Sequence, residues 1–151
     1  MYQLGITGGI GSGKSFICSI FSKIFKIPIY NSDFHAKNLM QHNRFLIENI
    51  STHFGNELYD TSRCLDRKRL ASIVFQNPDK LALLNSLVHP VVAEDYLEWV
   101  QKQKNCPFVI KEAAILFESG ANIHMNKIVS VFAPENIRIK RTSERDNIPP
   151  K

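Results

Sequence analysis

GGIGSGKS, at residues 8–15, is the stretch that decides the fold of this chain of 151 residues. It fits the phosphate-binding pattern G-x-x-x-x-G-K-[ST], whose fixed positions are filled by Gly8, Gly13, Lys14 and Ser15. An alternating apolar segment precedes it, and residues 14–25 repeat apolar side chains at helical spacing. A strand, a glycine-rich turn and a helix N-terminus form a nest of backbone N–H groups that holds a polyphosphate. The stretch therefore predicts an α/β domain that binds a nucleoside triphosphate.

Each part of this loop has an expected role toward the phosphates. The Lys14 ammonium would reach the β- and γ-phosphates, and the Ser15 hydroxyl would ligate Mg²⁺. Glycines in the turn permit a positive φ and a close approach of the backbone to the ligand. The backbone N–H groups expected to face the phosphate oxygens are those of Gly11, Ser12, Gly13, Lys14, Ser15 and Phe16.

The composition is typical of a globular protein. With 151 residues, 44% of them hydrophobic, the chain is long enough for one α/β domain with a core. No apolar run is long enough for a transmembrane helix, and the N-terminus leads directly into a strand, without room for a signal peptide. Cys18, Cys64 and Cys106 are widely spaced and show no metal-binding pattern, which suits a reducing cytosol. We expect a cytoplasmic protein without disulfides that binds no membrane.

The charge of the chain is basic but dispersed, with a formal net charge of +5 and an isoelectric point of about 9.2. Nucleic-acid binding is not expected, because the basic residues form no block. The nearest approach to a cluster is Arg138, Lys140, Arg141 and Arg145, which are interspersed with acidic residues. A charged helix face in water would account for this cluster. An anionic, phosphate-bearing substrate would also account for it, and the phosphate loop favours this second interpretation.

Four strands are predicted, in one parallel sheet. The loop follows a first strand at residues 2–6, and after the helix residues 27–30 form a second strand. A strand, a helix and a strand within about 30 residues form a βαβ unit, whose strands are parallel. Apolar runs at residues 108–111 and 128–132 predict two further strands of a sheet covered on both faces, and a basic helix follows Pro134.

Residues 34–104 contain no convincing strand and are predicted to be helical. Helices are expected at about residues 34–42 and 44–53, after Asp66 as an N-cap, and after Asn77-Pro78, with an interruption at His89-Pro90 before a further helix. This block is too long for a simple crossover between parallel strands. The chain is therefore predicted to have a nucleotide-binding core at residues 1–33 and 105–151, flanking an inserted helical subdomain.

Two acidic residues follow strands of the predicted sheet, at the edge where ligands bind in an open parallel sheet. Asp33 could accept the proton of a substrate hydroxyl that attacks the γ-phosphate, or it could cap the next helix. Glu112 stands where a phosphate-loop enzyme binds Mg²⁺ directly or through water, and a surface glutamate is an equal alternative. The residues alone leave both questions open.

The later part of the chain offers three further candidates. Arg141 and Arg145 lie four residues apart and hence on one helix face. They could stabilise charge on a transferring phosphoryl group, but as isolated features they are more typical of solvated arginines. His89, before Pro90, could be catalytic, although a packed histidine at a helix break is commoner. Metal binding by the other histidines is not expected.

Taken together, these segments resemble the dephospho-CoA kinase family of phosphate-loop kinases. They span nearly the whole chain: LGITGGIGSGKS at residues 4–15, NSDFHAKNL at 31–39, LDRKRLASIVFQNPDKLALLNSLVHP at 65–90, KEAAILFESG at 111–120 and APENIRIKRTSERD at 133–146. Many kinases share the loop. The LNSLVHP and ILFESG segments, and the paired arginines in this order, are much more specific.

The resemblance implies an activity. Members of the family phosphorylate the ribose 3′-hydroxyl of dephospho-CoA with ATP and Mg²⁺, which is the last step of coenzyme A biosynthesis. The implied fold is a P-loop NTPase-type parallel sheet flanked by helices, and the insert at residues 34–104 becomes the CoA-binding subdomain. Asp33 becomes the catalytic base.

The resemblance also assigns roles to basic residues. Lys14 and Arg141 would neutralise charge that develops during transfer. Arg145 would contact phosphate from a lid, whose first part lies at about residues 136–151. His89 would lie on the side of the substrate. No oligomeric state is implied.

The sequence departs from the family in three ways. Asn31 stands where the family often has a second aspartate, and Ala114 stands where many members have proline. Members also extend further, with the rest of a lid, a last strand and adenine contacts, so we expect a fragment or a defective version. The alternatives to this family are another small-molecule kinase of the same fold, such as a nucleoside or nucleotide kinase, and a nucleotide-binding module without catalysis.

Overall fold

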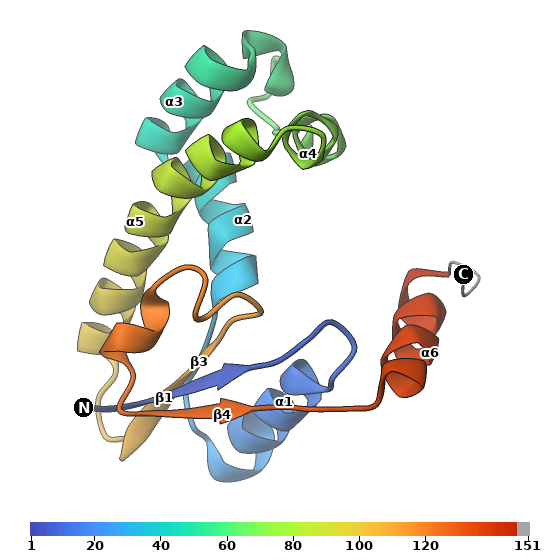
Figure 1. Ribbon diagram of the computed structural model, residues 1–151. Helices are drawn as coiled ribbons and strands as arrows, with labels where there is room; N and C mark the ends of the chain where they lie inside the picture. The colour runs from blue at the N-terminus through green and yellow to red at the C-terminus, as the bar shows by residue number, and fades with distance from the viewer. Residues whose placement is uncertain (148–151) are drawn as a thin grey trace. The chain divides into compact units, whose positions relative to one another are not determined.

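The computed structural model describes residues 1–147, which form two compact units. The first unit combines residues 1–32 with residues from Glu98 onward, and the second unit is Asp33–Leu97. The first contains β1 (Tyr2–Thr7), α1 (Lys14–Phe25), β2 (Ile29–Asn31), β3 (Phe108–Glu112), the 3-10 helix η2 (Ala121–His124), β4 (Lys127–Ser130) and α6 (Glu135–Asp146) (Figure 1). The second contains most of α2 (Ser32–His42) and α5 (Pro78–Lys102), with α3 (Arg44–Phe54), the 3-10 helix η1 (Asn56–Leu58) and α4 (Arg67–Phe75).

The strands of the described residues form one parallel sheet in the order β2-β3-β1-β4. β1 lies between β3 and β4, with Ile6 opposite Glu112 and Thr7 opposite Ser130. β2 pairs with the other side of β3 and places Asn31 opposite Glu112. In a parallel sheet all carboxyl ends lie at one edge, so the last residues of β1, β2 and β3 come together there. The predicted α/β fold with a parallel sheet is confirmed.

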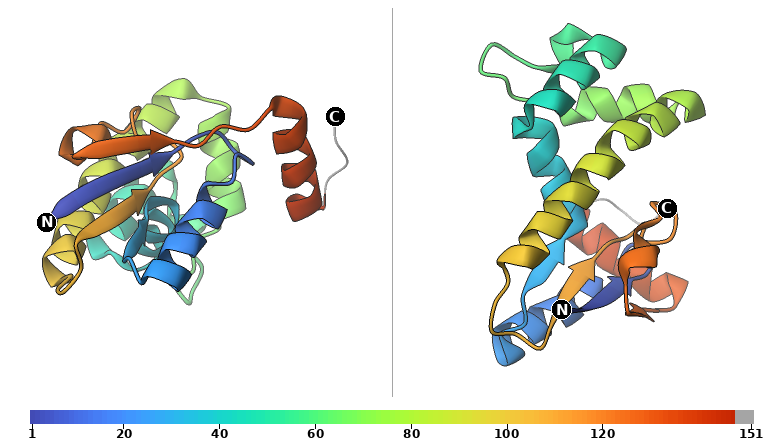
Figure 2. Two further views of the ribbon diagram at one scale, coloured as in Figure 1. Left: turned by 90° about the horizontal axis from the view of Figure 1, so that it is seen from below. Right: turned by 90° about the vertical axis from the view of Figure 1, so that its left-hand side faces the viewer.

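α1 covers one face of this sheet (Figure 2). Its buried Cys18 packs with Ile6 of β1, Ile110 of β3 and Ile27. Partly buried apolar side chains surround this cluster, namely Leu4, Ile17, Phe21, Ile29, Phe108 and Val131. Full burial of a side chain such as Ile6 or Ile110 contributes about 1.5–3 kcal/mol. This packing holds α1, and with it the phosphate loop, against the sheet.

The segments that flank β3 in the chain cover the opposite face. Trp99, in the last turns of α5, packs edge-on against the buried Tyr30 of β2, with 5.5 Å between the ring centroids. A Cβ at Gly5 of β1 would lie 2.8 Å from Leu116 Cδ2 and 3.1 Å from Met125 Cγ. Glycine at this strand position therefore lets the segment after β3 lie directly on β1.

Lys111 is a buried amine on this second face. Its side chain is only 4% exposed, and Nζ lies 5.7 Å from the centroid of the Tyr30 ring. Burial disfavours the charged form and lowers the pKa of Lys111 to about 8.

We predict that the contribution of Lys111 to the free energy of unfolding increases between about pH 7.5 and about pH 9. Above the native pKa of Lys111, about 8, and below its ordinary value of 10.5, the unfolded chain binds a proton that the native protein lacks. Unfolding then consumes a proton, so a rising pH disfavours it, by about 1 kcal/mol over this interval. Urea unfolding at the two pH values measures the change, and the Lys111→Met variant should lose it. An equal increase in both proteins would contradict the assignment.

The second unit is helical, and two of its helices, α4 and α5, begin at the caps that the sequence predicts. Asp66 Oδ1 accepts a hydrogen bond of 3.0 Å from the Arg69 N–H at the start of α4. Asn77 Oδ1 accepts hydrogen bonds of 3.0 and 3.1 Å from the N–H groups of Asp79 and Lys80 at the start of α5. Such caps satisfy donors that a helix leaves unpaired. Within residues 1–147, no helix is both long enough and apolar enough to cross a lipid bilayer.

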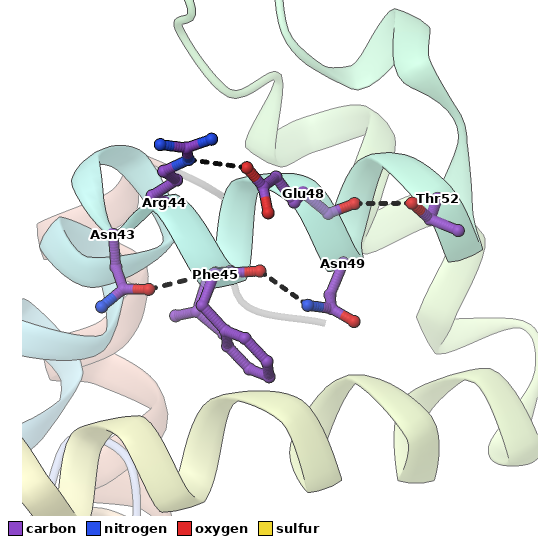
Figure 3. A network of polar contacts seen from close by, with 7 residues as sticks. Asn43, Arg44, Phe45, Glu48, Asn49 and Thr52 are labelled. Atoms are coloured by element: carbon purple, nitrogen blue, oxygen red, sulfur yellow. Dashed lines mark hydrogen bonds and ion pairs between the residues drawn. The ribbon is translucent and has the colours of Figure 1, made fainter.

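α3 shows how local contacts support one of these helices (Figure 3). The Asn43 side chain caps it by accepting a hydrogen bond from the Leu46 N–H at 3.1 Å. Across the first turn of the helix, Arg44 and Glu48 form an exposed ion pair of 2.8 Å at i,i+4 spacing. Exposed pairs of this kind contribute little to stability, because the solvent screens their charges. The buried face of the helix, formed by Leu46, Ile50 and Phe54, accounts for more of its stability.

Three details of the predicted elements are wrong, and one of them is that β4 occupies Lys127–Ser130 in place of the expected residues 128–132. α5 runs unbroken over Pro78–Lys102 and includes Pro90, where an interruption was expected. Proline has no N–H, so the carbonyl of Ser86 lacks its helical donor, but complete turns on both sides keep the helix continuous. β2 occupies Ile29–Asn31, later than the expected residues 27–30.

Candidate active site

The phosphate loop connects β1 to α1 through glycines in conformations that other residues rarely adopt. Gly8 has a φ of 143°, and Gly13, the N-cap residue of α1, has a φ of 107°. A side chain at Gly8 would also collide with the carbonyl oxygen of Val131. The Ser12 N–H donates to the Gly9 carbonyl at 3.2 Å and closes the turn. The N–H groups that follow belong to the first turn of α1, where a helix leaves its donors for a ligand.

Lys14 lies over this loop. Its Nζ donates hydrogen bonds to the carbonyl oxygens of Gly8, at 2.7 Å, and Gly9, at 3.1 Å. An ammonium group has three N–H bonds, so two hold the loop and one remains for a phosphate oxygen. Its positive charge adds to the helix dipole, which already favours an anion at the N-terminus of α1.

A buried carboxylate lies beside the loop at the end of β3. Glu112 is only 6% exposed. Its Oε1 accepts a hydrogen bond from Ser15 Oγ at 2.6 Å, and its Oε2 accepts one from Asn31 Nδ2 at 2.9 Å. A hydroxyl has one proton and two lone pairs, so Ser15 keeps both lone pairs for a cation. Hydroxyl and carboxylate oxygens suit Mg²⁺, and these residues therefore fit the predicted metal.

The thiol of Cys18 lies near the same carboxylate. Burial raises its pKa to about 12, and the charge of Glu112 and its hydrogen bond act in the same direction, while Lys14 opposes them. A thiol with such a pKa stays protonated and does not act as a nucleophile.

α6 lies against the loop through its arginines. Arg141 Nη1 donates to the carbonyl oxygens of Gly11 and Ser12, both at 3.3 Å. A Cβ at Gly9 would lie 2.6 Å from Arg138 Nη1, and a Cβ at Gly11 would lie 2.6 Å from the Arg138 carbonyl oxygen. The buried Nε of Arg138 has no hydrogen-bond partner among the described residues. The glycines at positions 9 and 11 therefore allow α6 to lie against the loop.

Residues 2–150 match the sequence profile of a family described as dephospho-CoA kinase. The chain belongs to this family. The dephospho-CoA kinase of Porphyromonas gingivalis is 39% identical over 146 residues, which cover 97% of this chain and 71% of that protein. The dephospho-CoA kinase of Chlorobaculum tepidum is 37% identical over 148 residues, covering 94% of this chain and 71% of that protein.

Solved structures agree with this family assignment. The dephospho-CoA kinase from Campylobacter jejuni superposes with a TM-score of 0.70 at 27% identity, covering 97% of this chain and 74% of that one. A protein from Thermus thermophilus superposes with a TM-score of 0.84 at 30% identity, covering 98% of this chain and 74% of that one. The present chain is thus shorter than these relatives of the dephospho-CoA kinase family.

The first unit brings together most of the site residues that the sequence predicts. Lys14, Ser15 and Glu112 lie at the loop, with the N–H groups of residues 11–16, and Arg141 donates to the loop carbonyls. The side chain of Phe16 is 70% exposed, so its expected contribution is its backbone N–H alone. The catalytic and binding roles of these residues stay predictions.

Three other predicted residues are not part of this cluster in the first unit. Asp33 and His89 belong to the second unit. Asp33 lies in the first turn of α2, whereas His89 lies inside α5, and burial lowers its pKa. Arg145 donates to the adjacent Asp146, with Nε–Oδ1 2.8 Å and Nη2–Oδ2 3.0 Å, instead of to the loop.

The sequence predicts no individual role for Asn31, and for Arg138 it predicts only membership of the basic cluster. Arg138 precedes Arg141 by three residues, so helical spacing alone places both on one face of α6. This spacing is therefore a signal in the sequence that can identify the contact of Arg138 with the loop. The contact of Asn31 with Glu112 depends on the register of two strands that are far apart in the sequence.

Gly11→Ala is expected to destabilise the protein more than Gly120→Ala. The two glycines have nearly equal φ angles, 75° and 72°, so the backbone strain of an alanine is matched, at about 1–2 kcal/mol. A Cβ at Gly11 would lie 3.0 Å from Arg138 Cα and closer still to its carbonyl oxygen, whereas a Cβ at Gly120 meets nothing within 4 Å. The collision should add about 1–3 kcal/mol. Urea unfolding gives the free energy of unfolding of both variants. If both substitutions lowered this free energy equally, the contact between the loop and α6 would be refuted.

Proposed function

We propose that this chain transfers the γ-phosphoryl group of ATP to the ribose 3′-hydroxyl of dephospho-CoA, giving coenzyme A and ADP. The family and the relatives described above are named dephospho-CoA kinase, which supports this reaction. The observation that carries the proposal is the Lys14 ammonium beside the Ser15–Glu112 pair at the N-terminus of α1. Together they offer a positive charge and a cation site to the terminal phosphates of a nucleotide.

In this proposal the loop binds the nucleotide and stabilises the charge of the transfer. The N–H groups of residues 11–16 bind phosphate oxygens, and the free N–H of Lys14 donates to the β- and γ-phosphates. Arg141 donates to the loop carbonyls, and its guanidinium has further donors for the transferring group. Ser15 and Glu112 hold Mg²⁺, which when bound neutralises charge on the phosphates.

We assign the proton transfer to Asp33. Its carboxylate accepts the proton of the 3′-hydroxyl while the hydroxyl oxygen attacks the γ-phosphorus and the bond to ADP breaks. The helical segment at residues 34–104 binds the CoA portion of the substrate, with His89 on the substrate side. Arg145 is a second phosphate contact from the lid, which it reaches by exchanging its pairing with Asp146.

The partner and the compartment follow from the same chemistry. A small phosphate-bearing substrate accounts for the basic residues of α6 without a nucleic acid or a membrane. All three cysteines are free, as is usual in a reducing compartment, and we place the protein in the cytoplasm.

The test is the formation of ADP from ATP with and without dephospho-CoA. We expect ADP formation to depend on dephospho-CoA and to yield one coenzyme A for each ADP. A panel of nucleosides and nucleotides as acceptors distinguishes another small-molecule kinase. ATP binding without transfer to any acceptor would identify a nucleotide-binding module. Either of these two results would overturn the proposal.

A further inference from the structure

The carboxylate of Glu112 is held by side chains from two other elements. Ser15, at the start of α1, donates to Oε1 at 2.6 Å, and Asn31, the last residue of β2, donates to Oε2 at 2.9 Å. Asn31 and Glu112 are register partners in neighbouring parallel strands. The backbone hydrogen bonds of the sheet therefore fix the position of the amide relative to the carboxylate.

Each of these two hydrogen bonds fixes one oxygen of the carboxylate, and the Cys18 thiol of α1 forms a further hydrogen bond with the same group. A carboxylate held from α1 alone has more freedom to turn about its last carbon–carbon bond, because that torsion has a broad energy profile. With Asn31 on Oε2, the other oxygen stays directed at Ser15. The proton of Ser15 then has a constant acceptor, and the lone pairs of its oxygen keep a constant direction.

We propose that Asn31 is a positioning residue for the Mg²⁺ site, which orients Glu112 and through it the hydroxyl of Ser15. The identity of the metal and of the nucleotide rests on the proposed function. Partners of this kind, one step removed from a metal, commonly decide how well the metal is bound.

An amide is suited to this place. Asn31 donates a hydrogen bond to a buried carboxylate without adding charge. A carboxylate in its place would have no proton to donate and would set two like charges opposite each other on neighbouring strands. Of Asn31 and Glu112, only Glu112 then carries a formal negative charge, and both of its carboxylate oxygens accept a hydrogen bond.

The test is ATP binding to the whole chain, measured by calorimetry in EDTA and in saturating Mg²⁺. We expect Mg²⁺ to strengthen ATP binding to the parent protein. Asn31→Ala should bind ATP normally in EDTA and should lose about tenfold or more of the gain from Mg²⁺. Gln101→Ala is the matched control, because Gln101 is an exposed amide in the last turn of α5, in the same unit as Asn31. It should keep the full gain.

A second variant separates positioning from direct binding. Asn31→Asp keeps the size of the side chain but cannot donate to Glu112, so it should lose the gain from Mg²⁺ as well. A larger gain in Asn31→Asp would mean that residue 31 binds the metal itself, and would overturn the proposal. So would an undiminished gain in Asn31→Ala, or a parent protein that gains nothing from Mg²⁺. Where Asn31→Ala fails to fold, as judged by urea unfolding, Asn31→Asp decides.

These measurements contain no dephospho-CoA. A chain that shows the expected effect of Asn31 but transfers no phosphoryl group would refute the proposed function alone. A chain that makes coenzyme A with an undiminished gain in Asn31→Ala would refute the role of Asn31 alone.

Discussion

Asp33→Asn is expected to lower kcat by about a hundredfold or more while ATP binding stays unchanged. Asp33 lies in the first turn of α2, directly after β2. An amide of the same shape cannot accept the proton of the 3′-hydroxyl, so the chemical step slows without a change at the phosphate loop. Steady-state formation of coenzyme A gives kcat, and calorimetry with ATP alone gives the affinity. An unchanged kcat would remove Asp33 from the role of base.

A matched control tests the structural alternative for Asp33. An acidic residue in the first turn stabilises a helix through its dipole, by about 0.3–1 kcal/mol. Asp79 occupies the first turn of α5 in the same unit. Asp79→Asn should therefore cost a similar amount of stability and leave kcat unchanged. If both variants lowered kcat equally, helix stability would explain the effect of Asp33.

Lys14→Ala is expected to weaken ATP binding and to lower kcat/KM by about a hundredfold or more. The substitution removes the charge that would meet the β- and γ-phosphates. It also leaves the carbonyls of Gly8 and Gly9 without their donor, so the loop loses part of its support.

Lys23→Ala separates these local effects from a change of net charge. Lys23 is an exposed residue in the last turn of the same helix, α1. Its loss should leave ATP affinity and kcat/KM within about twofold of the parent values, since exposed charges far from the ligand are screened by salt. Equal effects of the two substitutions would contradict the role of Lys14.

The local part of this structure follows from the sequence. Turn chemistry and helical spacing act over a few residues, so the loop, the first βαβ unit and the caps at Asp66 and Asn77 were all predictable. Pro90 misled the prediction for a physical reason. One missing hydrogen bond ends a weak helix, but in α5 the turns on both sides keep their own.

The geometry of the site was only partly predictable. The loop pattern identifies Lys14 and Ser15, because their roles depend on neighbours in the chain. From the sequence, Glu112 could equally be a metal-binding residue or a surface glutamate. The register of β3 with β2 places its carboxylate between Ser15 and Asn31. Likewise, the approach of Arg138 to Gly9 and Gly11 depends on the path of the chain after β4. Contacts set by strand order cannot be read from local pattern.

The three thiols of this protein differ in their exposure, and this difference allows each unit to be labelled with a dye. Cys18 is buried and stays protonated, so maleimide dyes would react instead at the exposed Cys64 and the half-buried Cys106. Cys64 belongs to the second unit and Cys106 to the first. The unmodified sequence therefore accepts a donor and an acceptor fluorophore, one in each unit. Resonance energy transfer between them, followed as ATP and dephospho-CoA are added, would record directly whether the substrates change the separation of the two units.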